Sequence, residues 1–338
     1  MKSQERYDAL DGLRTYAILG IVLMHVRANG AYNIGGYLYQ KIIPAFTDFV
    51  FLFMMISAFG MCCGYYERII SQKISVEEFY SKRYSKIWPF FALLCVLDFI
   101  ISPSLKALYE VFANLTLCFS LLPNAKISVI GVGWTLGLIF VFYLLFPFFC
   151  YLIHNKKRAV MSLLIAYGLN IVCSVYFFDI NHMLKGFSSR ANIVYCAIYF
   201  LAGGLIYLYR KEIATWVKKY KLLAVAVCCI SVVLYFATDS YSITAVNVLV
   251  CASLLCYSLG VDKKGILINP FTKFISGISF EIYLCHMLIF RVLEKLGMIH
   301  LVKNDVVSYI ITSVGTIAGA IVFSYVVKKI LKKIYKNK

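Results

Sequence analysis

Two side chains in the first apolar segment combine a fixed positive charge with a group that can carry a proton. Arg14 and His25 lie eleven residues apart, which on an α-helix corresponds to about 16 Å of rise and about three turns, so both face the same way. A guanidinium can hold a phosphate or carboxylate bidentately, and an imidazole can act as general base toward a hydroxyl. Alternatively, the arginine reaches toward a polar surface and the histidine is structural. The spacing alone does not decide between these interpretations.

A second pair of cations stands at the start of a later apolar segment. Arg83 and Lys86 are three residues apart, so a helix presents them on one face. Such a double cation can hold an anionic cosubstrate. Taken alone, the pair is explained more simply as the flanking charges of a membrane helix.

Four further residues carry weaker signals. Asp48 either orients His25 or is an interfacial carboxylate, and the second interpretation is favoured. Trp134 fits an interfacial aromatic belt better than a site. Glu281 and His286 share one late segment, but their i, i+5 spacing does not bring them together well, and His286 is the more functional candidate because it lies deeper.

Long apolar helices are needed to position these residues. The chain has 338 residues, of which 62% are hydrophobic and 15% charged, and its mean hydropathy is +0.80. These values exclude a soluble single-domain enzyme and a disordered chain. The apolar blocks are about 17–22 residues long, the length of a membrane-spanning helix. We therefore predict an all-α, polytopic transmembrane helical bundle, with 1–338 as one integral membrane domain and no separate soluble domain.

Charge decides how many apolar blocks span the membrane. Eleven blocks are visible, at about 12–28, 44–65, 87–101, 107–122, 132–153, 159–178, 191–209, 222–237, 243–259, 280–296 and 306–327. Eleven spans would place two basic loops outside, against the positive-inside rule. With ten spans both termini are cytoplasmic and 25 of the 34 lysines and arginines lie inside. Either 87–101 or 107–122 then fails to span, and 107–122 is the better re-entrant or interfacial candidate because it contains Glu110 and Asn114.

The remaining composition favours a membrane partner over nucleic acid or a metal. The net charge of +18 follows from topology, and the C-terminal lysines are expected to contact anionic lipid headgroups. These lysines are Lys328, Lys329, Lys332, Lys333, Lys336 and Lys338. The 12 cysteines form no CxxC motif, so no metal site is predicted. Neither a cleavable signal peptide nor a nucleotide-binding P-loop is visible.

Five segments in order resemble the acyltransferase-3 family of integral membrane acyltransferases, over about 10–290. These are Asp11-Gly12-Leu13-Arg14 with His25, the apolar run ending in Ser57-Ala58-Phe59, Arg83 to Pro89, Trp134 to Pro147, and Ile278 to His286. Ala58 stands where the family has glycine, and Lys86 where it has a second arginine, which keeps the charge but loses bidentate geometry. Leu138-Ile139-Phe140 replaces a glutamate of one family branch and resembles the branch linked to exopolysaccharide modification.

The resemblance implies an O-acyltransferase of the cell membrane that transfers groups other than amino-acyl groups. Acyl-CoA, usually acetyl-CoA, would act as cytoplasmic cosubstrate without a bound cofactor or metal, and the acceptor would be a sugar hydroxyl of a surface polysaccharide or lipid-linked glycan. His25 would be the base or acyl relay, and Arg14, Arg83 and Lys86 would hold the donor phosphates. The site would be lined by Asp48, Ser57, Trp134, Tyr143, Glu281 and His286.

Two alternatives to this enzyme stay open. One is a membrane protein for glycan export or assembly without acyl transfer. The other is a degenerate structural relative, against which the intact Arg14 and His25 argue. No fused hydrolase-like domain is expected after the last span.

Overall fold

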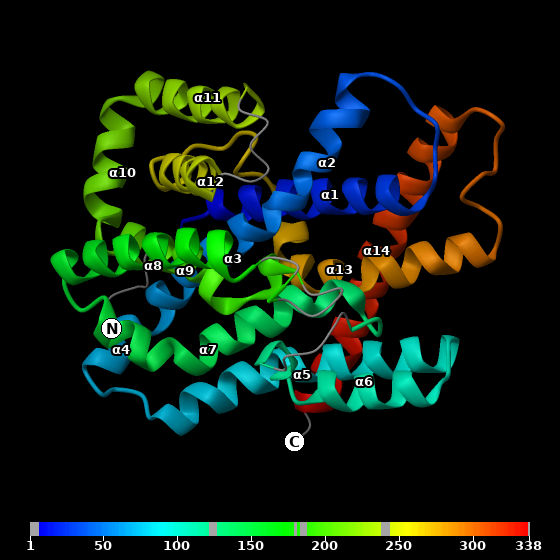
Figure 1. Cartoon of the computed structure of the whole chain (residues 1–338), viewed down its shortest axis with the longest axis horizontal. Helices are drawn as coiled ribbons and strands as arrows, with labels where there is room; N and C mark the ends of the chain where they lie inside the picture. The colour runs from blue at the N-terminus through cyan, green and yellow to red at the C-terminus, as the bar shows by residue number, and fades with distance from the viewer. Residues whose placement is uncertain (1–6, 122–126, 179–180, 183–187, 238–243, 337–338) are drawn as a thin grey trace.

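The computed structural model describes residues 7–121, 127–178, 181–182, 188–237 and 244–336. Within these ranges the regular secondary structure is helical throughout, with no strand (Figure 1). The predicted all-α fold is confirmed. The main helices are α1 (Ala9–Asn29), α3 (Phe49–Met61), α5 (Val76–Ile101), α6 (Leu105–Leu115), α7 (Trp134–Leu152), α8 (Lys156–Tyr176), α9 (Ile193–Leu208), α10 (Arg210–Lys219), α11 (Lys221–Ala237), α12 (Thr244–Leu259), α13 (Pro270–Lys295) and α14 (Asp305–Lys336).

The membrane-spanning character rests on helix length and hydropathy. In the described part of the chain, seven helices are long and apolar enough to cross a membrane, or eight if α9 and α10, bent by 74°, form one span. Helices α11 and α12 are apolar but shorter. The multi-pass character is thus confirmed, whereas ten spans and cytoplasmic termini stay predictions. Helix α6 has 11 residues, about 17 Å, and is too short to span, in line with the interfacial interpretation of 107–122.

Helix α1 runs through the middle of the assembly (Figure 1) and packs against α3, α12, α13 and α14. Gly12 permits its closest approach, because an added Cβ would lie 2.6 Å from the backbone Cα and O of Leu267. The Thr15 hydroxyl also donates to the carbonyl of Thr272 at 2.9 Å. The family-like segment at the start of α1 is therefore fixed against the beginning of α13.

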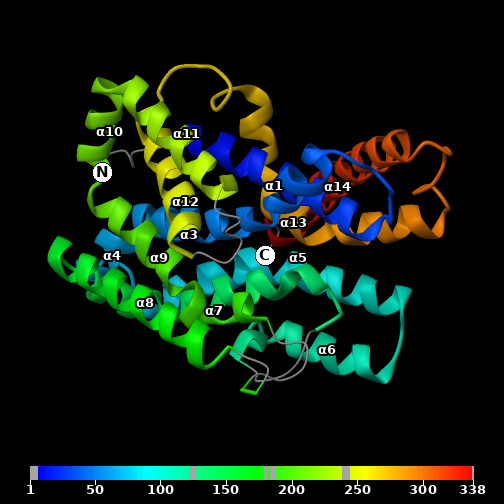
Figure 2. The same cartoon turned by 45° about the horizontal axis from the view of Figure 1, so that its top comes forward.

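Helices α13 and α14 form a tight antiparallel pair. Gly315 and Gly319 lie one turn apart on α14, and a Cβ on Gly319 would meet the Ile289 side chain at 2.7 Å. Small residues with this spacing let two membrane helices approach closely. The Phe90 and Phe323 rings, 6.2 Å apart, fasten α14 to α5. Figure 2 shows α5 and α6 side by side below this pair.

The second apolar segment is one bent helical run from Leu38 to Ile70. It contains π-helical turns at Leu38–Ile42 and Cys62–Tyr66 and a 3₁₀ turn at Phe46–Asp48. Such irregular turns are frequent at functional sites. Here the second π-helical turn carries Tyr65, whose hydroxyl accepts a hydrogen bond from Arg83.

Candidate functional site

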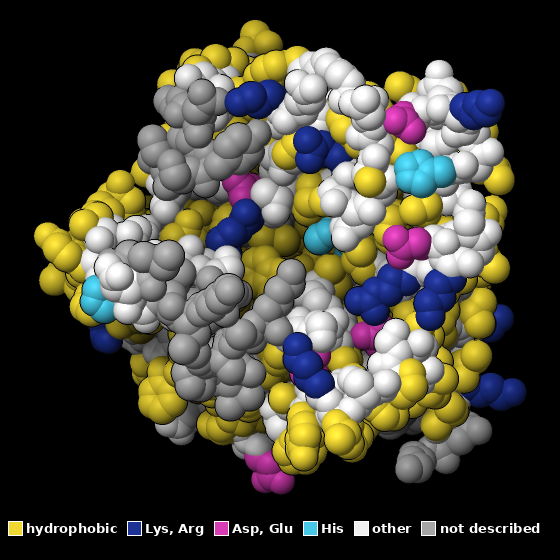
Figure 3. All heavy atoms as spheres, turned by 45° about the vertical axis from the view of Figure 1, so that its right-hand side comes forward, with side chains coloured by type: hydrophobic (Ala, Val, Ile, Leu, Met, Phe, Trp, Pro, Cys, Tyr) yellow, Lys and Arg dark blue, Asp and Glu magenta, His cyan; other side chains and the backbone are white. Residues whose placement is uncertain are grey.

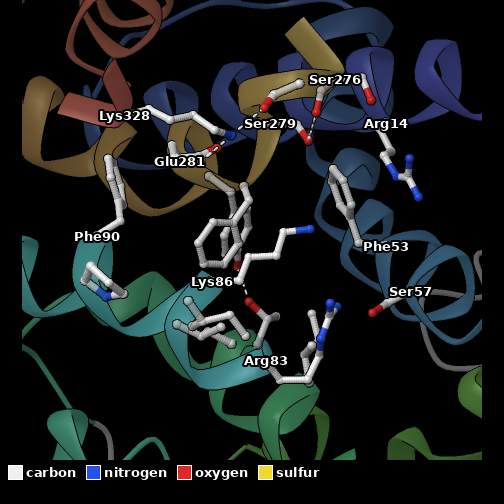
Figure 4. A pocket seen from close by; sticks show the side chains of 18 of the residues that line it. Arg14, Phe53, Ser57, Arg83, Lys86, Phe90, Ser276, Ser279, Glu281 and Lys328 are labelled. Atoms are coloured by element: carbon white, nitrogen blue, oxygen red, sulfur yellow. Dashed lines mark hydrogen bonds and ion pairs between the residues drawn. The ribbon is translucent and has the colours of Figure 1, made fainter. Parts of the chain in front are cut away.

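A cavity of about 580 Å³ lies between two hydrophobic cores. Helices α1, α3, α5, α7, α13 and α14 contribute to its wall (Figure 4). Phe53, Tyr143 and Tyr283 line the cavity and pack against both cores. Six of the predicted site residues line it, namely Arg14, Ser57, Arg83, Lys86, Tyr143 and Glu281. The sequence motifs thus converge on one cavity, although they come from separate helices.

The wall of the cavity is strongly basic. Among the described residues, five cations and one carboxylate line it. The cations are Arg14, Arg83, Lys86, Lys328 and Lys332, and the carboxylate is Glu281. The remaining lining is mostly apolar and aromatic. Such a combination suits a ligand with an anionic end and a less polar extension.

Arg14 is positioned by a short network at the start of α1. Its guanidinium lies 3.6 Å from the carboxylate of Asp11, which accepts a 2.7 Å hydrogen bond from the Ser276 hydroxyl of α13. Gly60 lies next to the guanidinium, and a Cβ there would be in van der Waals contact with it at 3.5 Å. Asp11 therefore holds Arg14 at the cavity wall.

Arg83 and Lys86 enter the cavity from α5. The Arg83 guanidinium donates to the Tyr65 hydroxyl at 2.6 Å and lies 4.7 Å from the centre of that ring. Its Nε is buried and has no hydrogen-bond partner among the described residues. Figure 4 shows the Lys86 ammonium directed into the cavity. The unsatisfied donor and the inward ammonium are suited to an anionic ligand.

Glu281 is neutralised from α14. Its carboxylate lies 2.6 Å from the Lys328 ammonium, which also donates to the Gly277 carbonyl at 2.6 Å. The sequence predicted lipid contact for the C-terminal lysines, whereas the structure brings Lys328 and Lys332 to the cavity wall. This placement was missed because only the charges of the lysines, and no motif, mark them in the sequence.

The aromatic wall joins α3 and α7. The Ser57 and Tyr143 hydroxyls are 3.3 Å apart, and the Arg83 guanidinium lies 6.0 Å from the Tyr143 ring centre. Trp134 is half-buried, packs against one core and is not a lining residue. Its neighbour Thr135 lines the cavity instead and donates to the Tyr283 hydroxyl at 2.6 Å. Sequence reasoning missed both Thr135 and Tyr283.

His25 and His286 form a pair with ring centres 5.1 Å apart. Neither lines the cavity, but the Tyr283 ring, which does, lies 6.0 Å from His286. The Nδ1 of His286 is 2.7 Å from the carbonyl of Tyr283, so Nδ1 carries the donated proton and Nε2 is an acceptor. Nε2 is buried with no partner in the described part of the chain. His286 therefore supplies a buried proton acceptor next to Tyr283 of the cavity wall, with the His25 ring beside it.

Asp48 belongs to a different polar group. Its carboxylate accepts hydrogen bonds from Arg190 at 2.7 Å, Tyr235 at 2.6 Å and Asn247 at 2.6 Å. The structure thus pairs the buried Asp48 with these three residues and not with His25. His25 lies against His286 instead, so the alternative in which Asp48 orients His25 is not what the structure shows.

The space-filling view shows charged and histidine side chains on one face of the molecule. Basic, acidic and histidine side chains lie among hydrophobic ones around a recess on the face turned forward in Figure 3.

Within the described residues, no cluster of three or more His, Cys, Asp or Glu side chains could hold a metal ion.

A comparison with family models agrees with the arrangement of these motifs. The model described as an acyltransferase domain matches residues 7–325, nearly the whole chain. Neither the curated proteins nor the solved structures give a significant match. The matched range includes both histidines and every cavity-lining residue except Lys328, Leu331 and Lys332 at the end of α14. This multi-pass membrane protein therefore belongs to the acyltransferase-3 family.

Proposed function

We propose that the chain transfers an acyl group, with acetyl as the expected one, from cytoplasmic acyl-CoA to a sugar hydroxyl. The acceptor would be a surface polysaccharide or a lipid-linked glycan, and the protein would act in the cell membrane. The observation that carries this proposal is the cavity itself, with five cations in its wall and the His25–His286 pair beside its lining residue Tyr283.

The positions of the cations and of the histidine pair indicate where the two ends of the acyl-CoA donor would bind. CoA has an anionic nucleotide end and a long, weakly polar pantetheine arm that ends in the thioester. The cations suit the phosphates, because guanidinium and ammonium groups bind phosphate by charge-assisted hydrogen bonds. Along α13, His286 lies about 15 Å beyond Ser276 of the cavity wall. The pantetheine arm would bridge that separation, so the thioester would reach the histidine pair.

The chemical step needs one base and one leaving group. The acceptor hydroxyl loses its proton to His25 as its oxygen attacks the thioester carbonyl carbon. A carbon–oxygen bond forms, the carbon–sulfur bond breaks, and the sulfur leaves with the electron pair and takes the proton from His25 to give free CoA, which returns His25 to its neutral form. His286, with its unsatisfied Nε2 acceptor, would stabilise the protonated form of the pair.

The test follows free CoA released from acetyl-CoA by the purified protein, with and without crude surface glycan. We expect glycan-dependent release by the wild type and its loss in His25→Ala. The matched control is His154→Ala, since His154 is exposed and outside the cavity. If the protein binds neither acetyl-CoA nor succinyl-CoA and releases no free CoA, glycan export would be favoured. Equal release by His25→Ala would remove His25 from the chemistry and keep the enzyme.

A further inference from the structure

The end of α14 forms one wall of the cavity, which no family-like motif includes. Lys328, Leu331 and Lys332 line the cavity, and their i, i+3, i+4 spacing places them on one face of the helix. Lys329 and Lys333 have the same charge and the same mutual spacing, but they do not line the cavity. These four lysines are therefore of two kinds, distinguished by helix face.

Packing holds this face in position. Gly319 brings α14 against Ile289 of α13, and the Cys285 thiol lies 3.4 Å from the Ser324 hydroxyl one turn before Lys328. The Phe90–Phe323 contact fixes the same part of α14 to α5, the helix of Arg83 and Lys86. The lysines of α14 and the cations of α5 therefore face one cavity from two fastened helices (Figure 4).

The lining of the cavity has more positive than negative side chains, which favours an anionic ligand. Glu281 is matched by Lys328 at 2.6 Å, and Arg14 lies beside Asp11. Among the described lining residues this leaves Arg83, Lys86 and Lys332 without a carboxylate partner, and the Arg83 Nε unsatisfied. A ligand with several negative charges would supply those partners. Lys328 can turn from Glu281 to such a ligand because its side chain is only partly buried.

We propose that Lys328 and Lys332 bind the nucleotide phosphates of the acyl-CoA donor, facing Arg83 and Lys86 across the cavity. This inference rests on the proposed function. The thioester would point toward the histidines, so the nucleotide would occupy the basic end of the cavity. The end of α14 is then a substrate-binding element, and only its other face is left for lipid headgroups.

The test compares two charge-matched double variants in nanodiscs of neutral lipid. Lys328→Gln/Lys332→Gln removes the cavity lysines, and Lys329→Gln/Lys333→Gln removes the same charge from the other face. The probes are CoA and adenosine 3′,5′-bisphosphate. We expect the first variant to raise both dissociation constants by about tenfold or more, because charge-assisted hydrogen bonds to phosphate are lost. The second variant should change them by less than about twofold.

Two controls separate ligand binding from folding. Lys328→Gln alone leaves Glu281 unpaired, so Glu281→Gln/Lys328→Gln is made beside it, and Lys332→Gln is made alone because Lys332 is exposed. Weaker nucleotide binding in both Glu281→Gln/Lys328→Gln and Lys332→Gln, with a thermal unfolding temperature unchanged from the wild type, supports the proposal.

Three outcomes can be told apart from that result. Equal effects of the two double variants would make the lysines a general surface charge and overturn the inference. Unchanged binding in every lysine variant would overturn it as well while leaving the proposed function standing. Failure of the wild type to bind either probe would overturn the proposed function itself.

Discussion

At the residue scale, the neutral tautomer of His286 is set by one contact. Its Nδ1 donates to the Tyr283 carbonyl, which leaves Nε2 as an acceptor. The ring centres of His286 and His25 are 5.1 Å apart. We expect His286→Gln to lower kcat by about a hundredfold, a typical loss for a proton-transfer partner. The KM for acyl-CoA should change by less than about threefold, because the donor cations lie in the cavity wall, which His286 does not line.

Steady-state kinetics with acetyl-CoA and glycan check this split, with His154→Gln as control. A raised KM at unchanged kcat would instead place His286 in donor binding. A melting temperature close to that of the wild type must accompany the measurement, since His286 is completely buried.

Gly12 has a role that the sequence motif does not explain. A Cβ at this position would lie 2.6 Å from the backbone of Leu267, and backbone atoms cannot move aside as a flexible side chain can. We expect Gly12→Ala to destabilise the protein by about 1–3 kcal/mol, the typical cost of overpacking. Gly168→Ala is the matched control, because nothing lies within 4 Å of its Cβ, and it should stabilise α8 by about 0.5–1 kcal/mol. The thermal unfolding temperatures of Gly12→Ala and Gly168→Ala are compared in the same detergent. Equal shifts from the wild type would disprove the role of the close approach between Gly12 and Leu267.

At the element scale, buried carboxylates hold the segment before α7. Glu110 of α6 accepts hydrogen bonds from the backbone and side chain of Ser128 and from the amide of Val129. Asp98 of α5 accepts from the amide of Ile130, whose φ of +47° is strained for a β-branched residue. Asp98 is itself paired with Arg291. This segment leads to Thr135 at the cavity wall, so α5 and α6 help to place it.

The Glu110 contacts predict a pH effect on this segment. Burial acts to raise the pKa of Glu110, but the hydrogen bonds from Ser128 and Val129 and the nearby Lys106 outweigh it and lower the pKa below its ordinary 4.5. A lowered pKa means that the ionised form stabilises the fold. This contribution is complete above pH 4.5 and is lost as the pH falls through the lowered value.

Hydrogen exchange of residues 128–133 is the measurement. Protection factors, which correct for the intrinsic pH dependence of exchange, are compared. We expect high protection at pH 6, a loss of protection as the pH falls through the lowered pKa of Glu110, and low protection at both pH values in Glu110→Gln. Exchange that is equally slow in the variant at pH 6 would show that Glu110 does not hold the segment.

The elements were more predictable than the contacts between them. Hydropathy predicted the apolar blocks, and the acidic and amide residues of 107–122 marked the segment that forms the short helix α6. The bend of 74° between α9 and α10 and the π-helical turn at Cys62–Tyr66 leave no hydropathy signal. The pairing of His25 with His286 joins residues 261 positions apart, and only tertiary packing brings them together.

At the scale of the whole molecule, the side of the membrane to which the basic cavity opens decides its ligand. A cavity open to the cytoplasm can bind acyl-CoA, whereas one open to the outside would have to bind an external anion. Acyl-CoA is a cytoplasmic compound, so the proposed function requires that Arg14, Lys86 and Lys332 lie on the cytoplasmic side. The distribution of lysine and arginine predicts that side from the sequence, because 25 of 34 fall inside in the ten-span arrangement. Helix length and hydropathy alone do not fix the orientation.

Fusion reporters test the orientation directly. We expect a green fluorescent protein fused after Lys338 to fluoresce and an alkaline phosphatase fused there to be inactive, because the C-terminal lysines adjoin the cavity. Fusions in the loop between α13 and α14, after Lys303, should show the reverse pattern, since α14, which is long and apolar enough to cross a membrane, lies between the two points. Active phosphatase at the C-terminus would place the cations outside, where no acyl-CoA is present. The cavity would then have to bind an external anion, and both the proposed acyl transfer and the donor role of Lys328 and Lys332 would fall together.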